Sequence, residues 1–225
     1  MLPILFEDND IIAIDKPEGL PVIPEQVPGD TVISRVAAHL SDKVYVIHRL
    51  DKDTSGVLLL AKNPASHQML NDQFSERQIR KTYLCLLHGT ITADEGRVSA
   101  PIRQFGSGRM GVDRRRGKPS QTEFRVLKRF RKYTLVEAAP LTGRRHQLRV
   151  HFYHIGNPIV GDRHYGDRKL QRAFARLMLH AQSISFRLPS GADIIVTAPV
   201  AASFEQALAK IVPPAPVRKT HRRRT

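Results

Sequence analysis

The apolar residues of this chain fall into short runs separated by clusters of Asp, Asn, Gly and Pro, a pattern typical of β-strands joined by turns. These runs predict strands over residues 4–7, 11–15, 44–47, 56–62, 81–89, 122–130, 133–139, 183–188 and 193–197. Capping residues, prolines and helical spacing predict helices over residues 31–40, 64–78, 144–155 and 203–210. Residues 106–117 are rich in glycine and arginine, and we expect a loop there. The whole pattern predicts an α+β fold with a mixed, largely antiparallel sheet and flanking helices and loops.

The length of 225 residues fits one large domain that buries a sizeable core. We expect this domain to span residues 1–212. Residues 213–225 combine prolines with five basic residues and no acid, which predicts a disordered basic tail. A hydrophobic fraction of 41% argues against general disorder, and the lack of a long uncharged apolar run argues against a membrane-spanning helix.

The formal net charge of +15 is unevenly distributed along the chain. Residues 103–132 hold eleven bases and two acids, whereas residues 1–30 hold seven acids and one base. A concentrated basic stripe attracts a phosphate backbone, so the charge predicts RNA as the partner. The alternatives are a solvated surface that aids solubility and an anionic membrane surface, and the second lacks the long basic amphipathic helix that it needs.

Two features of the sequence favour a reducing cytoplasm. The chain opens without a basic segment, and Glu7 and Asp8 soon interrupt its apolar run, which argues against a secretory signal. Cys85 is the single cysteine of the sequence and cannot form an internal disulfide.

Three patterns that imitate known motifs fail on inspection. The spaced glycines of residues 106–111 follow no strong strand and precede no helix, as a dinucleotide site would require. A calcium loop that begins at Asp51 would place Lys62 where a bidentate Glu is needed. The histidines of residues 146–154 lack the spacing and the Glu of a zinc-protease helix. The sequence therefore predicts no metal site and no cofactor.

Residues 48–56 concentrate chemistry between two apolar strands. Their nine positions hold two acids, two bases, an imidazole and two hydroxyls. Polar groups in such a place either find partners in a structural turn or are positioned for a function. Composition and spacing do not decide between these two interpretations.

A resemblance to a known family decides it. The run HRLDKDTSGVLLLAK, residues 48–62, resembles the signature of the RluA-type pseudouridine synthases. Three more stretches fit that family in the same order: DKPEGL at residues 15–20, KTY at residues 81–83, and LTGRRHQLRVH at residues 141–151 with its continuation GNPIVGD. The match begins close to residue 1 and resembles the short members of the family, in which no small RNA-binding domain precedes the catalytic one. We therefore expect the catalytic domain and its basic loops to recognise the RNA.

The resemblance implies a reaction in which uracil leaves its ribose, turns and rejoins through C5 without a cofactor. It places Asp51 at the centre of that reaction. A carboxylate can add to the base or to the anomeric carbon, or stabilise charge on the sugar, and these routes stay open. A carboxylate in a pocket that excludes water needs a cation beside it to remain charged. The resemblance assigns that position to Arg144, whose planar guanidinium suits a carboxylate.

The resemblance also implies which residues bind the substrate. Tyr83 and Leu148 match residues that sandwich the flipped base, and the Tyr83 hydroxyl is a candidate for proton transfer at C5. Arg49 matches a residue that moves toward the vacated stack. His48 and Thr54 are expected to take part by shaping the catalytic loop. Contacts to RNA phosphates are expected from Arg114, Arg115, Arg116 and Lys118.

The sequence thus predicts a monomeric, cytoplasmic RNA pseudouridine synthase that acts on tRNA or large-subunit rRNA. One alternative is a non-catalytic RNA-binding or ribosome-assembly protein that has kept the fold, and the intact set of Asp51, Tyr83 and Arg144 argues against it. Another alternative is a glycosidase or nucleoside hydrolase that acts through Asp51. No second carboxylate is identifiable as its general acid, and the basic surface suits a polymer better than a sugar.

Overall fold

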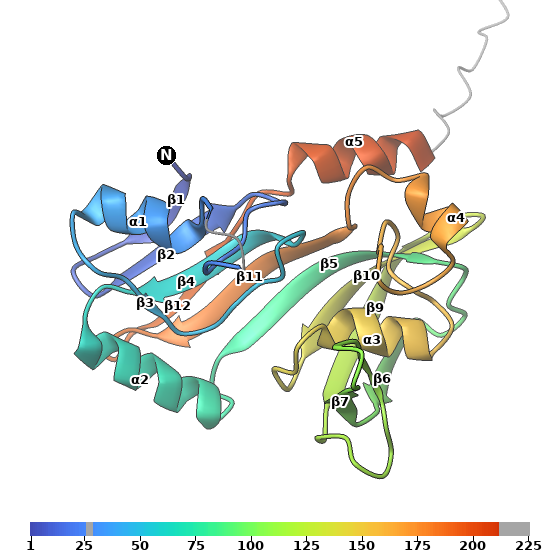
Figure 1. Cartoon of the computed structure of the whole chain (residues 1–225), viewed down its shortest axis with the longest axis horizontal. Helices are drawn as coiled ribbons and strands as arrows, with labels where there is room; N and C mark the ends of the chain where they lie inside the picture. The colour runs from blue at the N-terminus through green and yellow to red at the C-terminus, as the bar shows by residue number, and fades with distance from the viewer. Residues whose placement is uncertain (26–28, 212–225) are drawn as a thin grey trace, which may run out of the picture.

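A computed structural model describes residues 1–25 and 29–211 (Figure 1). The tail predicted for residues 213–225 lies outside these residues. No helix in the described ranges is long and apolar enough to cross a membrane.

A sheet of ten strands runs through the molecule in the order β1-β2-β4-β11-β5-β10-β9-β6, with β3 paired to β4 and β12 paired to β11. Its strands are β1 (Ile4–Glu7), β2 (Ile11–Lys16), β3 (Tyr45–Val46), β4 (Ser55–Ala61), β5 (Arg80–His88), β6 (Glu95–Ser99), β9 (Gln121–Arg129), β10 (Tyr133–Pro140), β11 (Leu179–Arg187) and β12 (Asp193–Thr197). Only β4 and β11 pair in parallel among these strands. The prediction of a mixed, largely antiparallel sheet in an α+β domain is confirmed.

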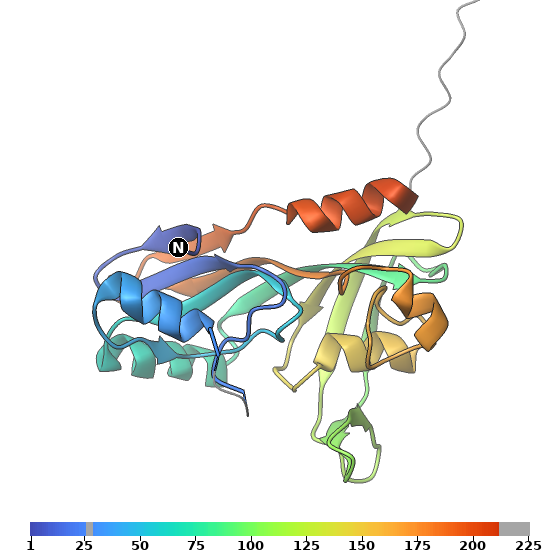
Figure 2. The ribbon, with the colours of Figure 1, turned by 45° about the horizontal axis from the view of Figure 1, so that its top comes forward.

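A separate hairpin of β7 (Ile102–Gln104) and β8 (Met110–Val112) projects from the body of the molecule (Figure 2). The prediction of a loop over residues 106–117 is therefore wrong for the segment that forms β8. Met110 and Ile102 are buried in a small cluster with Val150 and Tyr165. This tertiary contact stabilises strands of three residues, which are too short to show an alternating pattern in the sequence.

Five helices flank the sheet in the described part: α1 (Val32–Leu40), α2 (Pro64–Ser75), α3 (Gln147–His154), α4 (Arg168–Arg172) and α5 (Ala202–Ile211). Figure 1 shows α1 and α2 on one half of the molecule and α3 and α4 on the other, with β5 and β11 crossing between them. Capping explains the starts of the first two helices. The Thr31 hydroxyl accepts a hydrogen bond from the Ser34 N–H, and the Asn63 side chain accepts one from the Ser66 N–H.

Helix α3 begins three residues later than the sequence predicts. His146 has a left-handed backbone conformation, with φ of 55°, and the helical conformation starts only at Gln147. This turn of the chain places the first residues of α3 beside the middle of the sheet, where they take part in the candidate site.

The centre of the sheet is rigid where the site is built. Every residue of β4 is buried, and Cys85, Leu86 and Leu87 of β5 are fully buried. Gly56 permits the close approach of β4 to β11, because a Cβ at this position would lie 2.1 Å from the Ala181 carbonyl oxygen. The backbone that follows Asp51 therefore has little freedom to move.

Candidate active site

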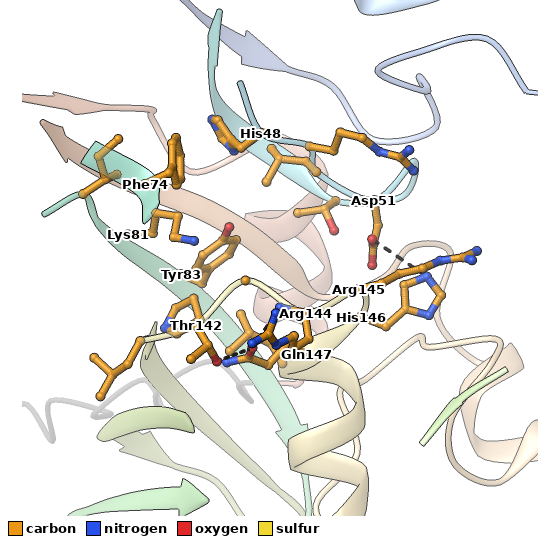
Figure 3. A pocket seen from close by; sticks show the side chains of 18 of the residues that line it. His48, Asp51, Phe74, Lys81, Tyr83, Thr142, Arg144, Arg145, His146 and Gln147 are labelled. Atoms are coloured by element: carbon orange, nitrogen blue, oxygen red, sulfur yellow. Dashed lines mark hydrogen bonds and ion pairs between the residues drawn. The ribbon is translucent and has the colours of Figure 1, made fainter. Parts of the chain in front are cut away.

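A cleft of about 960 Å³ opens between the two halves of the molecule (Figure 3). One wall is the loop of residues 47–54, which joins β3 to β4 and is called the catalytic loop below. Strand β5 contributes Lys81 and Tyr83, and the opposite wall is the segment of residues 140–149 that leads into α3. The structure thus brings together the motifs at residues 48–56, 81–83 and 141–151, which lie far apart in the sequence.

Buried side chains hold the catalytic loop from both ends. The amino group of Lys16, fully buried, donates hydrogen bonds of 2.8 Å to the carbonyl oxygens of Pro17, Leu20 and Lys52. Burial lowers the pKa of Lys16 to about 8. The three carbonyl acceptors compensate the hydration that the ammonium group loses. Lys16 therefore connects the motif at residues 15–20 to Lys52, the residue after Asp51.

A second anchor lies at the end of the loop. Arg176 donates to the Ser55 hydroxyl at 2.7 Å and to the Glu18 carboxylate at 3.1 Å, and the same hydroxyl lies 2.9 Å from His180 Nδ1. Sequence reasoning missed Arg176. Its signal was a lone base beside the apolar run Leu177-Met178-Leu179, a position where a charge needs a buried partner.

Asp51 lies on the cleft side of the loop with 26% of its side chain exposed. Its carboxylate accepts a hydrogen bond of 2.9 Å from Arg149 Nη1. Arg149, with only 4% of its side chain exposed, also donates to the fully buried Asp162 through Nε at 2.7 Å and Nη2 at 2.8 Å. One guanidinium therefore bridges two carboxylates, and its planar fork suits this task.

The arginine expected to pair with Asp51 was misassigned, because Arg149 occupies that position in this structure. Arg144 does line the cleft, but its Nε donates to the Pro119 carbonyl oxygen at 3.3 Å. The late start of α3 explains the difference. Arg144 lies in the turn before the helix, whereas Arg149 lies within it and faces the buried Asp162. The signal for Arg149 was its place between the apolar residues Leu148 and Val150.

Tyr83 and Leu148 both line the cleft, the first from β5 and the second from the start of α3. Leu148 is buried in the main core cluster, and Tyr83 packs against that cluster from β5. Burial, and next the charge of Asp51, raise the pKa of the Tyr83 hydroxyl well above its usual value. The hydroxyl therefore keeps its proton at neutral pH.

His48 connects the catalytic loop to β4, and Thr54 lies buried at the end of the loop. The His48 Nε2 accepts a hydrogen bond of 3.1 Å from the Leu59 N–H of β4. Burial, with a smaller contribution from Lys81, lowers the pKa of His48 to about 3, so the ring is neutral. Thr54 is buried, and its hydroxyl has no hydrogen-bond partner among residues 1–25 and 29–211. Arg49 is exposed at the rim of the cleft.

The predicted phosphate-binding residues surround a turn between β8 and β9. Arg114, Arg115, Arg116 and Lys118 are all exposed there. The Asp113 carboxylate accepts hydrogen bonds from the N–H groups of Arg115 and Arg116 and so shapes the turn. Arg144 Nε donates a hydrogen bond to the carbonyl oxygen of Pro119, the residue after Lys118, and so connects this turn to the cleft wall. None of the four bases lines the cleft itself, and this hydrogen bond is the link between their turn and the cleft wall.

His146 is a cleft residue for which the sequence predicts a packing or RNA-facing role and no catalytic one. Its Nε2 lies 3.8 Å from Asp51 Oδ1, and its Nδ1 lies 3.0 Å from the Tyr165 hydroxyl. Burial lowers its pKa to about 4. The described residues contain no group of three His, Cys, Asp or Glu that could hold a metal ion.

The fold, the bases that line the cleft and an arginine-paired aspartate beside a half-buried tyrosine are typical of an enzyme that modifies bases in RNA. A family model described as RNA pseudouridylate synthase matches residues 10–154. The chain belongs to the RNA pseudouridine synthases of the RluA type. The prediction of a catalytic isomerase is confirmed over the non-catalytic alternative.

Individual relatives agree with this family. The chain is 37% identical over 206 residues to an uncharacterized RNA pseudouridine synthase of Bacillus subtilis (strain 168), with 86% of this chain and 67% of the relative covered. It is 37% identical over 216 residues to the ribosomal large subunit pseudouridine synthase C of Vibrio cholerae, with 92% and 69% covered. Among solved structures, human RNA pseudouridylate synthase domain containing 1 superposes with a TM-score of 0.80 at 29% identity, covering 92% of this chain and 87% of that one.

Proposed function

We propose that this cleft isomerises a uridine of large-subunit rRNA to pseudouridine, with Asp51 as the catalytic carboxylate. The observation that carries the proposal is the geometry of Asp51. Its side chain is open to the cleft on one side and bound to the buried Arg149 on the other. An arginine does not give up its proton in such a site, so its positive charge stays beside the Asp51 carboxylate and no proton passes between them.

Asp162 is a positioning residue for Arg149 in this proposal. Its Oδ2 accepts a hydrogen bond from Arg149 Nε, and its Oδ1 accepts one from Arg149 Nη2. The same Oδ1 also accepts hydrogen bonds from the N–H groups of His164 and Tyr165. Four hydrogen bonds therefore fix the carboxylate that fixes the arginine. Preorganised charges of this kind need no rearrangement as the reaction proceeds.

Tyr83 and Leu148 hold the flipped uracil between the cleft walls. Unstacking a base costs a few kcal/mol, and apolar and aromatic surfaces in a pocket compensate that cost. Rejoining the base through C5 releases the C5 proton. The Tyr83 hydroxyl keeps its own proton because burial raises its pKa, so it acts as a relay: its oxygen accepts the C5 proton as its own proton passes to another acceptor. Arg49 is exposed at the rim of the cleft. From there its guanidinium can enter the space that the flipped base leaves in the RNA and lie against the neighbouring bases.

The names of the relatives support rRNA as the substrate, and the charge of the surface supports RNA in general. Several relatives that match most of the chain are named ribosomal large subunit pseudouridine synthase C. The exposed bases of residues 114–118 lie on the turn before Pro119, which Arg144 links to the cleft wall, and they favour a phosphate backbone of either kind of RNA. We expect the enzyme to act in the cytoplasm as a monomer. Transfer RNA is the other possible substrate.

The test is pseudouridine mapping by carbodiimide-dependent primer extension on rRNA and tRNA. Cells that lack the gene are complemented with the wild type or with Asp51→Asn. We expect one or more rRNA sites to disappear on deletion and to return with the wild type only. Purified Asp51→Asn should bind the same RNA with unchanged affinity, because the bases that bind the phosphates remain. Restoration of the site by Asp51→Asn would remove Asp51 from its role, and a site in tRNA would correct the substrate.

A further inference from the structure

The two carboxylate oxygens of Asp51 differ in their partners within the described part of the chain. Arg149 binds Oδ2, whereas no side chain among residues 1–25 and 29–211 donates a hydrogen bond to Oδ1. The polar atom recorded beside Oδ1 is His146 Nε2, at 3.8 Å. This separation is too long for a direct hydrogen bond. Figure 3 shows the His146 ring next to the Asp51 carboxylate at the cleft surface.

We propose that His146 and Asp51 together bind the 2′-hydroxyl of the target nucleotide, so that His146 is a further residue in contact with the substrate. This inference rests on the proposed function of the cleft. It assigns to the pair the recognition of ribose over deoxyribose at the reacting position.

The hydrogen bond to Tyr165 sets the tautomer of His146. Burial raises the pKa of the Tyr165 hydroxyl, so that group keeps its proton. Among residues 1–25 and 29–211, no group other than His146 hydrogen-bonds to this hydroxyl. The tyrosine proton is therefore left to donate to His146 Nδ1, 3.0 Å away. A neutral imidazole that accepts at Nδ1 carries its hydrogen on Nε2, on the side of Asp51.

The imidazole remains in this neutral form at the pH of the cell. Burial is the main cause that lowers the pKa of His146 to about 4, and the nearby charge of Arg149 acts in the same direction. The attraction of Asp51 opposes this shift without cancelling it. His146 therefore presents a single N–H donor to the gap, and Asp51 Oδ1 presents an acceptor across it.

The backbone of His146 is built for this placement. Its φ of 55° is a left-handed conformation that few residues other than glycine adopt, at a cost of the order of tenfold in local stability. The side chain has only 14% of its surface exposed and packs beside the rings of His164 and Tyr165. Strained and restrained residues of this kind gather at functional sites.

A hydroxyl fits the gap better than other groups of a nucleotide. An oxygen about 2.8 Å from both His146 Nε2 and Asp51 Oδ1 forms a triangle whose long side is the observed 3.8 Å. Such an oxygen must accept one hydrogen bond and donate another. The ribose ring oxygen and uracil O2 only accept, whereas the 2′-hydroxyl does both and lies on the carbon next to C1′. Asp51 has to approach C1′ or the base attached to it, which brings the 2′-hydroxyl to this pair.

The experiment compares two changes, one in the protein and one in the RNA. His146→Asn tolerates the left-handed backbone but is too short to reach Asp51, whereas His146→Gln keeps an N–H near the position of Nε2. Single-turnover formation of pseudouridine is measured on RNA with ribose or 2′-deoxyribose at the target uridine. His154→Asn makes the same substitution at an exposed position of α3 and serves as the control.

We expect wild-type enzyme to prefer the ribose substrate by about tenfold or more, as the removal of one hydrogen-bonded group predicts. His146→Asn should slow the ribose substrate by a similar factor and the deoxy substrate by less than about twofold. His146→Gln should recover most of the rate, and His154→Asn should match the wild type. If no enzyme converts the deoxy substrate, the comparison is made on binding affinity instead. The affinities of the wild type and of the three variants are then measured for the ribose and the deoxyribose RNA.

Equal losses on both substrates would overturn the inference and leave His146 with a structural role only. So would the absence of any wild-type preference for ribose in both rate and affinity. Thermal unfolding of each variant separates these outcomes from a loss of fold. The failure of the proposed function looks different, because the wild type would then form no pseudouridine in the ribose substrate.

Discussion

The replacement of one cleft arginine by lysine, at position 149 or at position 144, distinguishes the pairing observed in the structure from the one predicted from the sequence. Arg149 makes three hydrogen bonds of 2.7 to 2.9 Å to Asp51 and Asp162, in a position where 4% of its side chain is exposed. Arg144 makes one longer bond to a carbonyl oxygen from a partly exposed position.

Lysine carries one compact ammonium group and cannot span both carboxylates with the geometry of a guanidinium. In Arg149→Lys at least one charge-assisted bond is lost, and each such bond is worth about 1.5–3 kcal/mol. If the loss falls on Asp51 in the transition state, the rate decreases about tenfold to a hundredfold. Because a buried carboxylate is also left partly unpaired, we expect the free energy of unfolding to fall by about 2–4 kcal/mol. In Arg144→Lys both effects should be small, within about 0.5 kcal/mol of stability.

The assay is single-turnover pseudouridine formation on the mapped RNA, together with urea unfolding of each variant. Arg149→Gln, which keeps hydrogen-bond donors but no charge, shows whether the charge itself is required. Full activity of Arg149→Lys combined with inactivity of Arg144→Lys would refute the reasoning. That result would mean that the cleft rearranges on binding RNA and that Arg144 takes over the position beside Asp51.

Three more changes test other parts of the site. Tyr83→Phe removes a hydroxyl but keeps the ring, so we expect a slower C5 proton transfer with unchanged RNA affinity; a normal single-turnover rate would exclude the hydroxyl from that step. His48 has a pKa of about 3 in the folded protein against an ordinary 6.5, so the unfolded chain binds its proton first and stability falls as the pH drops below 6.5. His48→Gln should lessen this fall by about 1 kcal/mol between pH 6.5 and 5.5 in urea unfolding, and parallel pH profiles would contradict the shift. Replacement of residues 114–116 by alanine should weaken RNA binding and flatten its dependence on salt, up to about 0.9 in log–log slope for each phosphate that the variant no longer binds; an unchanged slope would place the RNA elsewhere.

Most elements of the fold follow from local signals. The buried run of β4 and the cap at Thr31 lie within a few residues of the structures they specify. The hairpin of β7 and β8 and the short helix α4 could not be predicted in this way. Their few residues carry too little periodicity, and packing against distant residues, Val150 and Tyr165 in the case of the hairpin, holds such short elements in place.

The residues of the site followed from motifs, but their pairing did not. Asp51, Tyr83 and Leu148 line one cleft, as the resemblance implied. The motif at residues 141–151 offers three arginines, and no local property distinguishes the one that meets Asp51. Successive side chains of a helix point about 100° apart, so which arginine faces Asp51 depends on where the helix begins and how it packs.

Short-range chemistry therefore suffices for most strands, the helix caps and the basic surface, and the resemblance of the motifs singles out the Asp51 carboxylate. The cation beside that carboxylate is a property of the tertiary structure, because Asp51 and Arg149 are 98 residues apart and meet only when the two halves of the sheet are joined. The position of Asp51 Oδ1 opposite His146 is a property of the same kind. Both depend on distances of a few ångströms between separate segments, and periodicity and composition carry no information about such distances.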